Sequence, residues 1–116
     1  MVLGARLAVD ELNGSVDNPA ERLELVVFDT RDMSERAISS AARGLVEAGV
    51  DAAVSGYASR DNVEIEVLAA TGIPYIVAEH SIETQRRIGR DPEGFETVWG
   101  LMPSYDAYGT AVPPYI

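Results

Sequence analysis

Cysteine and lysine are both absent from this chain of 116 residues, and each absence removes several kinds of chemistry. Without Cys there can be no disulfide, zinc–thiolate site, iron–sulfur cluster or thiol nucleophile. Without Lys the chain lacks the side chain that a P-loop places on phosphates and that pyridoxal enzymes use to form a Schiff base. We therefore expect no cofactor of these kinds.

Basic charge is scarce and long apolar runs are missing. Nine Arg face 19 Asp and Glu, which gives a formal net charge of −10. An acidic domain repels nucleic acid and anionic membranes, so neither is expected as a partner. No apolar run reaches the roughly 18 residues that suggest a membrane span. The N-terminus carries no basic segment followed by a short apolar stretch, so no signal peptide is predicted within this chain.

An alternation of helical and strand-like segments organises the sequence. Met1–Leu12 is predicted to be an amphipathic helix, with Leu3, Leu7 and Leu12 on one side. Strands are predicted at the largely apolar segments Leu23–Asp29, Val50–Gly56, Ile73–Ala78 and Thr97–Leu101. Further helices are predicted at Met33–Ala48 after a cap at Asp32 or Ser34, from Ser59 or Asp61 to about Ala70, in short form within Glu79–Arg90, and from Ser104 or Asp106 onward. This order predicts an α/β fold with a three-layer, doubly wound parallel sheet.

The ordered series of segments resembles a known family. The stretches GARLAVDELNG, LELVVFDTRDMSERAISSAARGLVEAGVDAAVSG, AATGIPYIVAEHS and VWGLMPSYDAYGTA are similar to type 1 periplasmic binding proteins, especially the branched-chain amino acid and amide receptors of ABC transporters. In that family two α/β lobes close on a ligand between them. The resemblance covers nearly all of residues 1–116 and implies a single α/β lobe that corresponds to part of the N-terminal lobe.

One strand of the family pattern has no counterpart here. The family's strand order is 2-1-3-4-5, and its first strand precedes the helix that matches Met1–Leu12. The strands at Leu23–Asp29 and Val50–Gly56 would then flank a gap, which leaves backbone groups unpaired. Three solutions are open: a fragment of a longer receptor, direct pairing of the two flanking strands, or a homodimer in which a neighbouring chain fills the gap.

Candidate ligand contacts follow the predicted strands, because ligands of open parallel sheets bind at the carboxyl ends of the strands. After Val50–Gly56 come Tyr57, Ala58, Ser59 and Arg60; the resemblance implies that Ser59 holds a ligand carboxylate, and Arg60 could pair an anion. After Ile73–Ala78 come Glu79, His80 and Ser81, of which Ser81 fits the family's contact to the ligand's polar end, whereas Glu79 and His80 depart from it. Helix capping by Ser59, solvation of Arg60 and a structural role for His80 are the alternatives. Trp99, Tyr57 and Tyr105 could add an aromatic wall, or could be core and surface aromatics.

No catalytic or metal site is expected. His80 is the sole His, so neither a metal cluster nor a Ser–His–Asp set has independent support. The resemblance implies a substrate-binding component for amino acids, amides or related molecules, which acts outside the cytoplasm with a membrane permease. The alternative is a cytoplasmic ligand-sensing domain of the same fold that switches a partner protein.

Overall fold

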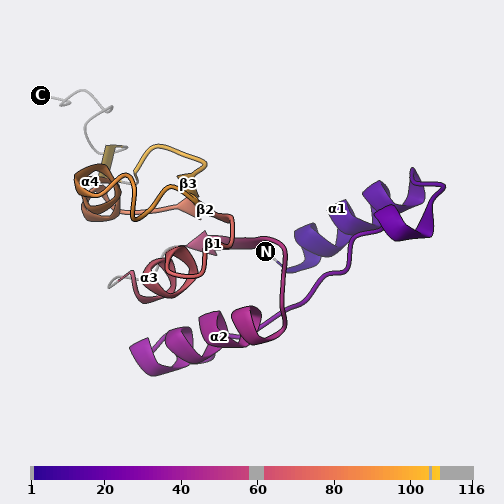
Figure 1. Ribbon diagram of the computed structural model, residues 1–116, viewed down its shortest axis with the longest axis horizontal. Coiled ribbons are helices and arrows are strands. Elements are labelled where there is room, and N and C mark those ends of the chain that lie inside the picture. Colours follow the sequence, from indigo (N-terminus) through magenta and orange to yellow (C-terminus); the bar gives the residue numbers. More distant parts are fainter. Residues whose placement is uncertain (1, 58–61, 105, 108–116) are drawn as a thin grey trace, which may run out of the picture.

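A computed structural model describes residues 2–57, 62–104 and 106–107, and these residues form a mixed α/β structure around a parallel sheet (Figure 1). Their elements follow one another in the order α1 (Val2–Gly14), η1 (Pro19–Glu21), α2 (Glu35–Glu47), β1 (Ala53–Tyr57), α3 (Val63–Ala69), β2 (Tyr75–Glu79), α4 (Ile82–Arg90) and β3 (Val98–Gly100). The strands lie in the order β1-β2-β3, and both neighbouring pairs are parallel. The α/β class predicted from the sequence is confirmed.

Helices α2, α3 and α4 cover one face of the sheet. The core consists of buried residues from all three strands and α3, namely Ala53, Ile65, Leu68, Tyr75, Val77 and Val98. Leu45 from α2 and Ile88 from α4 pack against it, and α2 lies along α3. The apolar spacing of these helices produces this layer, because each presents its apolar side to the sheet.

The opposite face of the sheet is bare among the described residues. The register places Val54 beside Ile76 and Ile76 beside Trp99, so these three side chains form one row across the sheet. Their exposed fractions are 68%, 39% and 49%. The described residues therefore form two layers, whereas the sequence predicted three.

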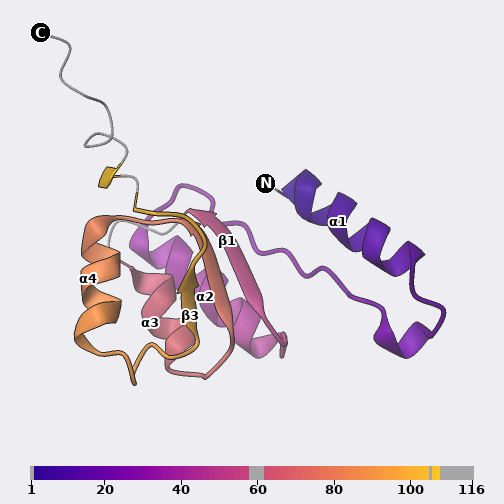
Figure 2. The same cartoon turned by 90° about the horizontal axis from the view of Figure 1, so that it is seen from above.

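The predicted strand Leu23–Asp29 is wrong as a paired strand. The segment is extended but makes no ladder with another strand, and its apolar side chains are exposed, from 36% at Leu25 and Val26 to 51% at Leu23. Its β-type composition is insufficient because a strand is stabilised by a neighbour's backbone, and direct pairing with the Val50–Gly56 segment does not occur. Figures 1 and 2 show α1 projecting away from the sheet, with this segment running back from it toward α2.

Local capping residues set the ends of α2 and α3, and only some of them were predicted. Ser34 caps α2, as predicted, by accepting a bond from the Ala37 amide at 3.3 Å. Gly49, with φ of 67°, follows α2 and turns the chain toward β1. The N-cap of α3 is Asn62 in the left-handed region, at φ of 55°, so the predicted caps Ser59 and Asp61 are wrong.

The segment Glu79–Arg90 is more ordered than the sequence suggested. It contains α4, a regular helix of nine residues, where a loop with a short helix was predicted. Ser81 begins the helix by accepting a bond from the Thr84 amide at 3.1 Å. The predicted final helix begins with Asp106 and Ala107, and its continuation lies outside the described residues.

Candidate functional site

The carboxyl ends of the three strands meet at one edge of the sheet, as parallel pairing requires. Tyr57 ends β1, Glu79 ends β2 and is followed by His80 and Ser81, and Gly100 ends β3. The predicted contacts Ala58, Ser59 and Arg60 lie outside the described residues, as does Tyr105. The structure therefore describes the second predicted loop in full and the first only at Tyr57.

His80 is the most unusual side chain at this edge. It is 6% exposed, and within the described part of the chain its Nδ1 has no hydrogen-bond partner. The ring packs against the backbone of Gly100, where an added Cβ would lie 2.5 Å from Cε1 and 3.0 Å from Nδ1. Because an unsatisfied buried polar atom costs about 1–3 kcal/mol, a ligand atom that bonds Nδ1 would recover that cost.

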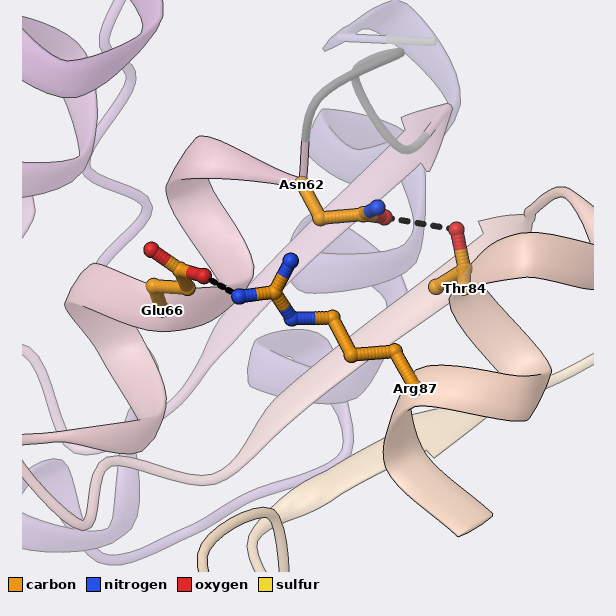
Figure 3. A network of polar contacts seen from close by, with 4 residues as sticks. All are labelled: Asn62, Glu66, Thr84 and Arg87. Atoms are coloured by element: carbon orange, nitrogen blue, oxygen red, sulfur yellow. Dashed lines mark hydrogen bonds and ion pairs between the residues drawn. The ribbon is translucent and has the colours of Figure 1, made fainter. Parts of the chain in front are cut away.

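A buried side-chain hydrogen bond joins Asn62, at the start of α3, to Thr84 of α4 (Figure 3). The Thr84 hydroxyl, on a side chain that is 1% exposed, donates to Oδ1 of Asn62 at 2.6 Å. The Ser81 and Thr84 hydroxyls lie 2.9 Å apart, and since the Thr84 proton goes to Asn62, Ser81 donates in this pair. Ser81 was among the contacts predicted from the sequence, whereas Asn62 and Thr84 were not, although Ser before a helix is a typical N-cap.

The N-terminus of α4 already holds two acceptors of its own. Ser81 Oγ takes the Thr84 amide, and the Asp106 carboxylate takes the Ile82 amide at 2.7 Å. A ligand carboxylate at this helix end would have to displace Asp106. The nearby Glu79 is half-buried and adds a second carboxyl group, so the charges at this loop suit an ammonium or an amide N–H better than an anion.

Two further contacts surround the polar edge. Glu66 of α3 and Arg87 of α4 form an ion pair on the surface (Figure 3), with both side chains about half exposed. Below the edge, the Tyr75 and Ser55 hydroxyls lie 2.6 Å apart. Burial raises the pKa of the Tyr75 hydroxyl well above its usual value near 10; Glu64 adds to this and the Ser55 bond opposes it.

The predicted contacts are only partly brought together. Glu79, His80 and Ser81 adjoin one another, but their environments differ: His80 is buried, whereas Glu79 and Ser81 are half-buried. Tyr57 is 57% exposed, and Trp99 lies on the bare sheet face, so no aromatic wall forms from these two. Across residues 2–57, 62–104 and 106–107, no three His, Asp or Glu side chains gather closely enough to hold a metal ion.

None of the helices in the described ranges is both long and apolar enough to cross a membrane. Comparison with protein-family models, curated proteins and solved structures gives no significant match to this chain. The class that the fold and site define is an α/β domain with a parallel sheet and polar side chains at the carboxyl ends of its strands.

Proposed function

We propose that this chain is the ligand-binding α/β lobe of a type 1 periplasmic binding protein, the substrate-binding component of an ABC transporter for amino acids, amides or related small organic molecules. The family strand pattern 3-4-5 accounts for the order β1-β2-β3, and the doubly wound third layer belongs to this proposal. The observation that carries it is the buried, unpartnered Nδ1 of His80 at the carboxyl edge of a parallel sheet.

The polar groups around His80 favour one chemical class of ligand. Glu79 beside His80 and Asp106 at the start of α4 supply carboxylate oxygens, while Ser81 supplies a hydroxyl. Together these groups accept more hydrogen bonds than they donate, which favours a ligand end rich in N–H groups. Amides and the ammonium end of amino acids have that character.

The test is a titration of the whole chain with a panel of amides and amino acids, followed by the imidazole nitrogen signals of His80 in NMR spectra. In the family the ligand lies between two lobes, and one lobe supplies about half of the contacts. Binding is therefore expected to be weak, with Kd on the order of millimolar, which corresponds to about 4 kcal/mol. The Nδ1 signal should shift first, because that atom gains a partner.

A matched pair of variants makes the test specific. His80→Gln should abolish ligand binding as measured by calorimetry, whereas Ser40→Ala, on α2 away from the strand edge, should leave binding and the His80 response intact. Perturbations confined to residues away from Glu79–Ser81, or an unchanged Nδ1 signal throughout the panel, would refute the proposed site. Tight binding by the chain alone would contradict the half-site arrangement.

A further inference from the structure

Among the residues that the structure describes, two apolar surfaces lack a cover, and both belong to the same layer of an α/β fold. One is the bare sheet face with its row Val54, Ile76 and Trp99. The other is the arm, Val2–Asp29, which comprises α1 and the extended segment Leu23–Asp29. Parallel sheets are stable when both faces are covered by helices, so the bare face needs a helix.

Helix α1 has the composition of such a cover, but only its first residue, Val2, reaches the groove beside β1. It buries no residue, and Leu3, Leu7 and Leu12 are 81%, 61% and 54% exposed. Residues four apart form two adjacent rows on its surface, Leu3–Leu7–Glu11 and Gly4–Ala8–Leu12, which are apolar except for Glu11 at one end. The opposite side carries Arg6.

No strand among the described residues pairs with the outer edge of β1, which adjoins a groove. The groove has a volume of about 830 Å³ and runs between β1, the apolar side of α2 at Ile38, Ala41 and Ala42, and Val27–Thr30. A strand in this groove would pair with β1 and bury the side chains of one of its faces against α2. Leu23–Asp29, with apolar residues on both of its faces, has the composition of a strand covered on both sides.

One contact fixes α1 to the extended segment within the arm, and another fixes the end of the arm to α2. Asn13 binds Leu23 reciprocally, its Nδ2 donating to the Leu23 carbonyl at 2.9 Å and its Oδ1 accepting from the Leu23 amide at 2.7 Å. At the other end the Phe28 ring lies on Gly44 of α2, where it occupies the space of a Cβ. The molecule is elongated, 57 Å by 31 Å by 31 Å, and Figures 1 and 2 show α1 lying apart from the sheet.

The turn that joins the arm to α2 is strained. Arg31 and Met33 both adopt left-handed backbone conformations, with φ of 51° and 59°, which are unfavourable for residues with side chains. Short strained hinges promote exchange of the attached segment between copies, because straightening the hinge releases the strain.

We propose that two copies of this chain exchange their arms, so that α1 of each copy covers the bare sheet face of the other and Leu23–Asp29 pairs with the free edge of the other's β1. The occupant is a second copy because its arm carries the missing helix and the missing strand in one piece. The contact is reciprocal, so a two-fold dimer forms both interfaces at once. Each copy has a net charge of −10, so added salt strengthens the dimer by screening the repulsion.

The sole Trp gives a direct readout. Trp99 is half exposed in the isolated copy and becomes covered by α1 in the dimer. Its emission is expected to shift to shorter wavelength as the chain is concentrated from the micromolar range upward, in step with the mass measured by sedimentation. Leu7→Glu should weaken this dimerisation at least about tenfold, since burial of one Leu is worth that much, whereas Arg6→Glu on the opposite side of α1 should not.

Cross-linking identifies which copy supplies the helix, because the chain has no Cys of its own. Copies that carry Leu7→Cys are refolded together with copies that carry Ile76→Cys and then oxidised. A disulfide between the two copies is expected, and the matched mixture of Arg6→Cys with Ile76→Cys should remain uncoupled. A blue-shifted Trp99 in a chain that stays monomeric would overturn the proposal, since α1 would then cover its own sheet. A concentration-independent, exposed Trp99 would also overturn it.

Discussion

At the scale of single residues, the buried polar groups carry the strongest constraints in this molecule. Tyr75 is 1% exposed and shares a 2.6 Å contact with Ser55, and its pKa is raised by burial. His80 lies against Gly100 with no room for an added methyl group. Each of these positions leads to a measurable expectation.

High pH should unfold the protein through Tyr75. A phenol whose pKa is raised by folding stays protonated in the native state, whereas the unfolded chain loses the proton near pH 10. Its stability contribution is therefore complete below about pH 10 and is lost as the pH rises above that value. Circular dichroism measured from about pH 8 to about pH 12, the range in which tyrosines lose their proton, should show a loss of structure that accompanies the deprotonation of Tyr75.

Tyr75→Phe provides the matched comparison. It should flatten the alkaline transition and cost about 1 kcal/mol at neutral pH, because Ser55 loses the Tyr75 hydroxyl and keeps only its 3.3 Å bond to the Tyr57 carbonyl. Tyr57→Phe, at an exposed position, should leave the transition unchanged. An alkaline transition that persists in Tyr75→Phe would show that another group is responsible.

Gly100→Ala should destabilise the fold by about 1–3 kcal/mol, because the new Cβ overlaps the His80 ring and neither backbone nor ring can move freely. Gly89→Ala is the control: Gly89 lies within α4 with open space around it, so Ala should stabilise the protein by about 0.5–1 kcal/mol. Urea denaturation measures both. Equal midpoints for the two variants would contradict the close packing of His80 on Gly100.

At the scale of elements, α3 and α4 are joined by two contacts of very different strength (Figure 3). The Thr84–Asn62 hydrogen bond is buried, whereas the Glu66–Arg87 ion pair lies in solvent. The buried hydrogen bond should contribute more to stability than the exposed ion pair, because water competes for the ion pair and cannot reach the hydrogen bond.

Thr84→Val should therefore cost about 1–3 kcal/mol by leaving Asn62 Oδ1 unpaired, and Thr84→Ser should restore most of it. Arg87→Ala should cost no more than about 1 kcal/mol, and less at high salt. The free energy of unfolding from urea titration measures all three. A larger loss in Arg87→Ala than in Thr84→Val would reverse the proposed ranking.

At the scale of the whole molecule, the packed body, which is the sheet with α2, α3 and α4, should be locally more stable than the projecting arm. The radius of gyration is 16.1 Å, against about 13 Å for a compact domain of this length. Arg22 lies exposed on the arm, and Arg31 lies exposed in the turn that joins the arm to α2. Local stability is low where few apolar contacts are made.

Brief trypsin digestion of the dilute chain should thus cleave after Arg22 and Arg31 before it cleaves after Arg87 in α4. Mass spectrometry of the products at successive times measures the order. In a concentrated sample, cleavage after Arg22 and Arg31 should be slower, because the arm is then covered by the other copy. Prior cleavage within α4 would contradict the division into body and arm.

The sequence by itself determined α1, α2, α3 and the three parallel strands, since these follow from side-chain spacing and from the Ser34 cap, whereas it predicted α4 only as a short helix in a loop. It also marked Glu79, His80 and Ser81 as neighbours at a strand end. Only the tertiary structure decided that His80 is buried without a partner for Nδ1, and that Asn62 and Thr84 meet across two helices. It alone left Leu23–Asp29 unpaired, because a strand depends on backbone groups of a neighbour that local composition does not encode.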